Sequence, residues 1–233
     1  MPISTIAFDA DDTLWENEEF FRLTEERFRD LLTEHVDRED IAKDLLETEK
    51  RNLRYYGYGI KGFTLSMIET AIEVTGGKIP ATIIQEILHA GREMFDHPAV
   101  PLSGVRETLQ TLHGNYRIVL ITKGDLFDQE RKLAQSGLGD FFDAVEIVSE
   151  KEADTYHRIF DQYGDGPARS TMVGNSMKSD VVPAIEAGAF GVFIPSQITW
   201  AMEEAAPPDG HERFHQLSNI TQLPDLIEQI TSA

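Results

Sequence analysis

The sequence contains no cysteine among its 233 residues. This absence excludes disulfide bonds, catalytic thiols and metal sites built from thiolates. The seven histidines show no spacing typical of a metal site, and we expect them at the surface or in local packing. A chain without cysteine fits a reducing compartment, and we expect a cytoplasmic location.

Long hydrophobic runs and basic residues are also scarce. No uninterrupted apolar stretch approaches the roughly 20 residues that a membrane-spanning helix needs, and the N-terminus lacks the basic and apolar pattern of a signal peptide. Lysine and arginine number 21 against 41 acidic residues, which gives a formal net charge of −20. Such an acidic surface repels phosphate backbones and anionic lipids. We therefore expect no nucleic-acid partner and no membrane partner, while the oligomeric state is not readable from this sequence.

Short apolar runs rich in β-branched residues are present, and helical patterns separate several of them. The runs that we interpret as strands are residues 6–8, 118–121, 145–148, 172–173 and 192–194. Gly137, Gly164 and Gly188 stand where the intervening helices should end. Strands that alternate with helices predict parallel βαβ units. The sequence therefore predicts an α/β fold with a doubly wound parallel sheet.

Residues 16–98 break this alternation, because apolar residues recur there at helical spacing without a convincing strand. We predict about four helices in this region. Three aspartates precede it, and the proline-containing residues 96–104 follow it. We therefore expect two domains: an α/β core formed by residues 1–15 and 100–233, and an all-helical domain inserted over residues 16–99.

Polar side chains follow four of the predicted strands, at the sheet edge where open parallel sheets bind ligands. Clustered carboxylates are costly to ionise unless a cation lies among them. Oxygen ligands without sulfur suit Mg²⁺, which commonly joins one or two carboxylates to a substrate phosphate. With a hydroxyl and an ammonium nearby, the set matches the needs of phosphoryl transfer. In chain order these residues are Asp9, Asp11, Asp12, Thr13, Thr122, Lys123, Gly124, Lys151, Asn175 and Asp180.

Four segments, FDADDTLW, LITKGD, VSEK and VGNSMKSD, resemble the four ordered motifs of the haloacid dehalogenase-like hydrolases, in their phosphatase branch. The resemblance runs from residue 6 to about residue 195. It implies a Rossmann-like core, a helical cap over residues 16–99, and Mg²⁺ as the cofactor. The implied activity is hydrolysis of a small phosphorylated metabolite through an aspartyl-phosphate intermediate.

The resemblance also implies a role for each motif residue. Asp9 would be the nucleophile, and Asp11 the general acid and then the general base. Lys151 would hold the Asp9 carboxylate and the phosphate in place. The implied substrate-binding residues are Thr13, Thr122, Lys123 and Gly124. The implied magnesium ligands are Asp9, the carbonyl group of Asp11, Asn175 and Asp180.

Three positions depart from the most frequent family pattern. Asp12 stands where glycine is often found, although aspartate is also common there. Lys123 stands where asparagine is frequent, so it adds positive charge beside the phosphate. Asn175 stands where aspartate is frequent, so it removes one negative charge from the metal site. Two arrangements stay open: either Asn175 is a direct ligand through its amide oxygen, or Asp180 ligates the metal and Asn175 lies behind it.

The segment YYGYGIKG, residues 55–62, lies between two predicted helices. It is interpreted either as a cap loop that selects the substrate, with Lys61 contacting an anion, or as a flexible connection between helices.

Other functions of the same family compete with phosphatase activity. A 2-haloacid dehalogenase needs a nucleophilic aspartate but no metal, so Asp11, Asn175 and Asp180 argue against it. Nothing in the sequence supports a phosphate mutase. A non-catalytic or regulatory binding module stays open, because Lys123 and Asn175 depart from the pattern and a fold does not dictate activity.

Overall fold

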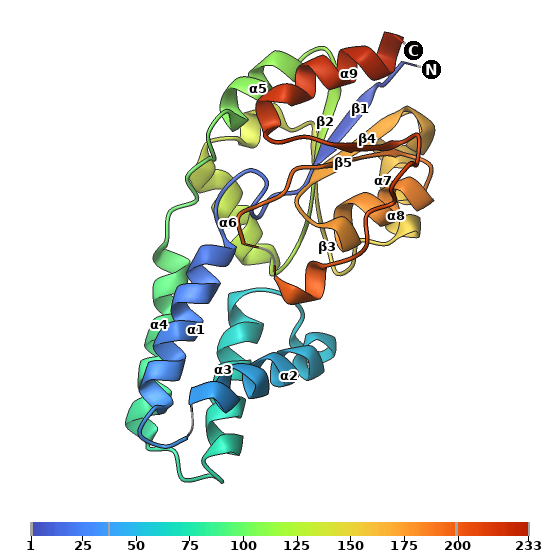
Figure 1. The fold of residues 1–233 in the computed structure, drawn as a ribbon. Helices are drawn as coiled ribbons and strands as arrows, with labels where there is room; N and C mark the ends of the chain where they lie inside the picture. Colours follow the sequence, from blue (N-terminus) through green and yellow to red (C-terminus); the bar gives the residue numbers. More distant parts are fainter. Residues whose placement is uncertain (1, 37, 199, 233) are drawn as a thin grey trace. The chain divides into compact units, whose positions relative to one another are not determined.

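The computed structural model describes residues 2–36, 38–198 and 200–232 (Figure 1). The chain forms two compact units, which we call the α/β unit and the helical unit. The α/β unit comprises Met1–Glu18, Ala99–Lys123 and Glu130–Ala233. The helical unit comprises Glu19–Pro98 together with Gly124–Gln129. The domain limits expected from the sequence stay a prediction, and so does the function of the helical unit as a cap.

A six-stranded parallel sheet forms the centre of the α/β unit. Its strands are β1 (Thr5–Phe8), β2 (Arg117–Lys123), β3 (Ala144–Val148), β4 (Ser170–Gly174), β5 (Phe190–Phe193) and β6 (Phe214–Gln216). They are arranged in the order β3-β2-β1-β4-β5-β6, and every neighbouring pair is parallel. The predicted α/β fold with a doubly wound parallel sheet is confirmed. This order places the ends of β2 and β4 on either side of the end of β1.

The sequence predicts five of these six strands. β6 has only three residues and no alternating apolar pattern, so nothing local marks it as a strand. It forms because β5 offers it a parallel edge, where Gly191 lies next to Phe214 in the register.

Alternate residues of β1 face opposite layers of helices, as the geometry of a strand requires. The helices of these layers are α5 (Val105–Leu112), α7 (Ala153–Tyr163), α8 (Val182–Glu186) and α9 (Leu223–Ser232). Ile6 and Phe8 pack with α5 and α9, while Ala7 packs with α7 and α8. In Figure 1, α5 and α9 lie on one side of the sheet and α7 and α8 on the other. All three side chains are fully buried. The central strand is therefore held from both sides just before the chain reaches its aspartates.

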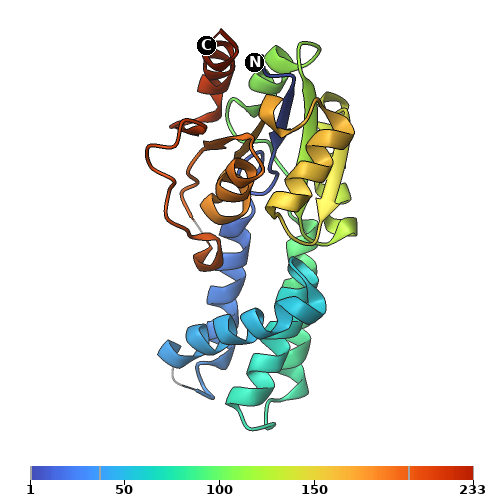
Figure 2. The same ribbon diagram turned by 90° about the vertical axis from the view of Figure 1, so that its right-hand side faces the viewer.

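The helical unit is described through four main helices: α1 (Glu18–Leu32), α2 (Arg38–Tyr56), α3 (Ile60–Val74) and α4 (Ala81–Asp96). Apolar side chains at helical spacing, such as Phe28, Leu45, Met67 and Ile87, meet in one buried cluster. Figure 2 shows the ribbon of these helices from a second side. A fifth helix, α6 (Leu126–Ser136), begins in this unit and continues in the α/β unit. None of the helices in the described ranges combines the length and apolarity needed to cross a bilayer.

Candidate active site

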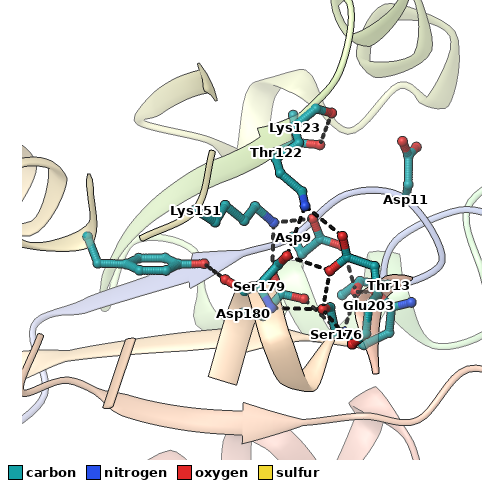
Figure 3. A network of polar contacts seen from close by, with 12 residues as sticks. Asp9, Asp11, Thr13, Thr122, Lys123, Lys151, Ser176, Ser179, Asp180 and Glu203 are labelled. Atoms are coloured by element: carbon teal, nitrogen blue, oxygen red, sulfur yellow. Dashed lines mark hydrogen bonds and ion pairs between the residues drawn. The ribbon is translucent and has the colours of Figure 1, made fainter. Parts of the chain in front are cut away.

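Asp9 directly follows β1, and only 7% of the residue is exposed. The Lys151 Nζ atom lies 2.5 Å from Asp9 Oδ1 and 2.7 Å from Asp180 Oδ1. Lys151 and Asp180 are buried as well. One ammonium group therefore bridges two buried carboxylates (Figure 3), and three of the residues expected at the site meet.

The charges in this cluster do not balance. Burial raises the pKa of Asp9 to about 7; Lys151 opposes this shift, and the carboxylates of Asp180 and Asp11 add to it. Burial disfavours the charge on Lys151, but the Asp180 and Asp9 carboxylates together outweigh burial and raise the pKa of Lys151. Lys151 therefore stays protonated while facing two carboxylates. The excess negative charge is a situation that a bound metal ion resolves.

Asp180 is held by the unusual helix that follows β4. Residues Met177–Val181 form a π-helix, η3. Ser176 precedes it, and its Oγ accepts the backbone N–H of Ser179 at 2.9 Å. The backbone N–H of Ser176 donates to Asp180 Oδ2 at 2.9 Å. Both oxygens of the Asp180 carboxylate are therefore engaged, one by Lys151 and one by the backbone. π-Helical turns are frequent at functional sites.

Thr13 and Asn175 meet at the second carboxylate oxygen of Asp9. Thr13 Oγ1 lies 3.2 Å from Asp9 Oδ2 and 3.2 Å from Asn175 Oδ1, and it accepts the Asn175 backbone N–H at 3.1 Å. The end of the Asn175 amide also lies 3.2 Å from Asp9 Oδ2 and from the Asp11 carbonyl oxygen. An amide nitrogen turned toward these oxygens donates to them, whereas an amide oxygen in that place needs a cation between.

This donor set fits Mg²⁺, which takes one or two carboxylates and keeps several waters. The Asp9 carboxylate, the Asp11 carbonyl oxygen and the Asn175 amide are the neighbouring groups. In the part of the chain that the structure describes, no three Asp, Glu or His side chains are grouped to hold a metal. The neighbouring donors that the structure offers here are oxygens of a carboxylate, a carbonyl group and an amide.

Lys123 reaches the same cluster, where it is paired with Glu203. The Lys123 Nζ atom lies 2.6 Å from Glu203 Oε1 and 2.9 Å from Ser179 Oγ. Glu203 also accepts hydrogen bonds from Ser176 Oγ at 2.5 Å and from Ser179 Oγ. Burial acts to raise the pKa of Glu203, but Lys123 and these hydrogen bonds outweigh it and lower that pKa. Sequence reasoning missed Glu203, which lies 80 residues after Lys123 in no recognisable motif.

The other residues expected to bind substrate make contacts of a different kind. Thr122 is buried, and its Oγ1 donates to the Lys123 carbonyl oxygen at 3.2 Å. Gly124 has a φ of +129°, a conformation that favours glycine. Lys61 lies in the helical unit, where its ammonium is 2.9 Å from both carboxylate oxygens of Asp125. The roles of Thr122, Gly124 and Lys61 in substrate binding stay predictions.

The Asp11 carboxylate points away from Asp9 in Figure 3. Its Oδ1 and Oδ2 atoms lie 2.7 and 2.9 Å from the ammonium of Lys132, and Trp15 Nε1 donates to Oδ1 at 2.7 Å. Lys132 belongs to α6, where sequence reasoning did not single it out. A lysine on a polar helix is usually solvated. Lys132 is instead buried, with 8% of the residue exposed, and this burial distinguishes it from a surface lysine.

Asp12 shapes the turn between β1 and α1. Its φ of +61° makes it the one non-glycine residue with positive φ among the described residues. Aspartate tolerates this left-handed conformation better than most residues do. The Asp12 carboxylate accepts the backbone N–H groups of Asn17 and Glu18 at 3.0 Å, at the start of α1. Burial raises the pKa of Asp12 to about 6, against the effect of these N–H groups.

Comparison with known proteins agrees with the fold described above. The family model for haloacid dehalogenase-like hydrolases matches residues 3–188. A solved structure of a hydrolase of this family from Xanthomonas campestris is 40% identical, with a TM-score of 0.88 over 99% of this chain and 92% of that one. A magnesium-bound protein of the same hydrolase type from Bacillus subtilis, 13% identical, shares the fold with a TM-score of 0.67 over 97% and 99% of the two chains.

Two curated relatives are named as phosphate-releasing enzymes. Glyceraldehyde 3-phosphate phosphatase of Methanothermobacter thermautotrophicus is 29% identical over 54% of this chain and 58% of the relative. Pyrimidine 5′-nucleotidase of Escherichia coli is 31% identical over 52% and 56%. The matched region thus spans just over half the length of these relatives. Because the family model covers most of the sequence, this chain belongs to the haloacid dehalogenase-like hydrolase family.

Proposed function

We propose that this chain is a Mg²⁺-dependent phosphomonoester hydrolase that acts on a small phosphorylated metabolite. The main support is the buried Asp9 carboxylate, held 2.5 Å from the Lys151 ammonium with Asp180 on the other side of that ammonium. A buried carboxylate fixed in this way is suited to act as a nucleophile. The two relatives that are named as a phosphatase and a nucleotidase support the substrate class.

The reaction proceeds in two steps at phosphorus. An Asp9 carboxylate oxygen forms a bond to the phosphorus of the ester, and the bond from phosphorus to the leaving alcohol breaks while Asp11 gives its proton to the departing oxygen. Asp11 then takes a proton from water, whose oxygen attacks the phosphorus of the aspartyl phosphate. The bond between Asp9 and phosphorus breaks, and inorganic phosphate leaves. Lys151 keeps its positive charge throughout and compensates the charge on the transferred group.

Asp9, the Asp11 carbonyl oxygen and the Asn175 amide oxygen would hold the magnesium ion. We favour Asn175 over Asp180 as the direct ligand, because both oxygens of Asp180 already accept hydrogen bonds. When bound, the ion supplies positive charge that polarises a phosphate oxygen. The magnesium bound by the Bacillus subtilis protein of the same fold supports this choice of metal.

Hydroxyl and cationic groups around Asp9 would bind the substrate. Thr13 lies against the Asp9 carboxylate, and Lys123 lies in the same polar cluster. We expect Lys123 to exchange part of its contact with Glu203 for a phosphate oxygen. The net charge of −20 disfavours nucleic acid and anionic membranes as partners, so we propose small metabolites as substrates. The cytoplasmic location that we propose is supported by the lack of cysteine.

Hydrolysis of p-nitrophenyl phosphate and of a panel of phosphorylated metabolites tests this proposal. The panel includes sugar phosphates, phosphoglycolate, glyceraldehyde 3-phosphate and nucleoside monophosphates, each with Mg²⁺ and with a chelator. We expect phosphate release that requires the metal. Asp9→Asn should lower kcat by about 10³-fold or more, whereas Asp140→Asn, an exposed aspartate of the same unit, should not.

Two outcomes would contradict the phosphatase proposal. No hydrolysis across all esters and several divalent metals would favour the non-catalytic binding module. Halide release from a 2-haloacid in the presence of chelator, without phosphatase activity, would favour a dehalogenase.

A further inference from the structure

We infer that Lys132 is a positioning residue for Asp11 in the reaction, an inference that rests on the proposed phosphatase function. Lys132 projects from α6 and is 8% exposed. A lysine this well buried requires partners for its charge, because removing an ammonium from water is costly. Its partners therefore indicate what the side chain does.

The ammonium of Lys132 is shared between two residues of the segment that follows β1. It lies 2.7 and 2.9 Å from the two carboxylate oxygens of Asp11 and 3.0 Å from Asn17 Oδ1. Trp15 adds a third constraint by donating its Nε1–H to Asp11 Oδ1 at 2.7 Å. Trp15 is itself fully buried in the core of the α/β unit. The Asp11 carboxylate is thus held from both oxygens by groups that cannot easily move.

The two catalytic carboxylates proposed above consequently have separate cations. Asp9 is paired with Lys151, and Asp11 is paired with Lys132. Because the carboxylate of Asp11 points toward Lys132 and not into the Asp9 cluster, the two negative groups are kept apart (Figure 3). A general acid is effective only from a defined place beside the leaving oxygen. Lys132 therefore acts on the leaving-group step through Asp11, while Lys151 acts on the nucleophile.

This division of roles predicts a dependence on the leaving group. The measured quantity is kcat/KM for p-nitrophenyl phosphate and for an alkyl phosphate, because kcat/KM reports the transfer of the phosphoryl group to Asp9. A nitrophenolate leaves with little help from an acid, whereas an alkoxide needs a proton. Lys132→Met should lower kcat/KM about 30-fold for the alkyl ester and less than about 3-fold for the aryl ester.

Three further variants make the comparison specific. Lys132→Arg keeps a positive charge next to Asp11 and should restore most of the alkyl-ester activity. Arg131→Met removes a charge from the same helix, where the arginine donates to Gln135, and should change neither rate. The double variant Asp11→Asn with Lys132→Met should differ from Asp11→Asn alone by less than about 2-fold in kcat/KM for the alkyl ester. If Lys132 acts through Asp11, its replacement has no further effect once Asp11 has lost its function, so the effects of the two substitutions are not additive.

Folding is followed by thermal unfolding of each variant. If Lys132→Met does not fold, Trp15→Phe takes its place, because it keeps an aromatic ring in the core while removing the N–H that holds Asp11. It should show the same preference, a larger loss on the alkyl ester than on the aryl ester.

Equal losses on both esters, or a loss that persists in the Asp11→Asn background, would overturn the positioning role while leaving the phosphatase proposal intact. A wild-type protein that hydrolyses neither ester would overturn the phosphatase proposal and this inference together.

Discussion

The ammonium of Lys151 lies 2.5 Å from a carboxylate oxygen of Asp9, although 142 positions separate the two residues in the chain. Lys151 follows β3 and Asp9 follows β1, and β2 lies between these strands. Two strand spacings amount to about 10 Å, a span that the long side chain of lysine helps to cover. The contact exists because the sheet order places both strand ends at one edge.

Replacing Lys151 with methionine should destabilise the protein strongly. The change leaves Asp9 and Asp180 buried and facing each other without the ammonium that joins them. Removing one partner from a buried ion pair costs about 3–5 kcal/mol. The free energy of unfolding, measured with urea at pH 7.5 without divalent metal, should fall by this amount.

The double variant Lys151→Met with Asp180→Asn is the informative control. It removes the repulsion between the two carboxylates, so it should be more stable than Lys151→Met alone. Lys178→Met, at an exposed lysine of η3, should cost at most about 1 kcal/mol. Equal stability of wild type and Lys151→Met would show that the bridge does not stabilise the fold.

Magnesium binding should depend more on Asn175 than on Asp180. The Asn175 amide lies 3.2 Å from Asp9 Oδ2 and from the Asp11 carbonyl oxygen, whereas Asp180 is engaged by Lys151 and Ser176. Asn175→Ala should weaken Mg²⁺ binding at least about 10-fold in calorimetric titration without substrate. Asn175→Asp should strengthen it, because a second carboxylate joins the ligands. A larger loss in Asp180→Asn than in Asn175→Ala would reverse the assignment of the ligands.

Glu203 should stabilise the α/β unit in a pH-dependent way. Its folded-state pKa is lowered from the ordinary 4.5, because Lys123 and the hydroxyls of Ser176 and Ser179 outweigh the effect of burial. The unfolded chain therefore takes up a proton first as the pH falls, so the contribution is present above pH 4.5 and is lost on acidification. Glu203→Gln should lower the free energy of unfolding by about 2 kcal/mol at pH 7.5.

The neighbouring exposed residue offers a matched comparison for this change. Glu204→Gln removes the same charge one position later and should change stability by less than about 0.5 kcal/mol. A Glu203→Gln protein as stable as wild type at pH 7.5 would contradict a stabilising role for the pair with Lys123.

Glu49 should have the opposite dependence on pH. Burial in the helical unit raises its pKa from the ordinary 4.5 to about 7, and the Glu25 carboxylate adds to the shift. The folded state therefore binds a proton that the unfolded state has released, so stability falls as the pH rises from 4.5 to 7. Glu49→Gln removes this loss and should raise the free energy of unfolding by about 3 kcal/mol at pH 8.

The gain from Glu49→Gln should shrink as the pH falls toward 4.5, and urea denaturation over the range pH 5 to 8 measures it. Glu47→Gln, at an exposed position of the same helix, should show no such trend. A constant difference between Glu49→Gln and wild type at all pH values would disprove a shifted titration at this residue.

Much of the fold was open to prediction because its signals are local. Buried strands such as Ile6–Ala7–Phe8 are recognised by their apolar, β-branched or aromatic composition. The helices are recognised by the spacing of their apolar residues. β6 and the π-helix η3 were missed for a physical reason. A three-residue strand exists only through pairing with β5, and the wider turn of η3 has no distinctive spacing of its own.

Some residues of the candidate site could be predicted from the sequence, and others could not. The motif residues Asp9, Thr13, Lys151 and Asn175 were expected together from their positions after the strands, and the structure brings them together. Glu203 lies in a short 3-10 helix, Ala201–Glu203, and in no motif, so nothing in the sequence separates it from the other glutamates of a strongly acidic chain.

The sequence by itself was sufficient to indicate the parallel sheet and to locate the strand ends that carry carboxylates, a hydroxyl and an ammonium. This was possible because the hydrophobic periodicity that marks a strand or a helix is a property of neighbouring positions in the chain. Only the folded structure decided which lysine pairs with which carboxylate. Lys151 pairs with Asp9, Lys132 with Asp11, and Lys123 with Glu203. Such pairings depend on a few ångströms between segments that lie far apart in the chain, and strand order and helix packing set those distances.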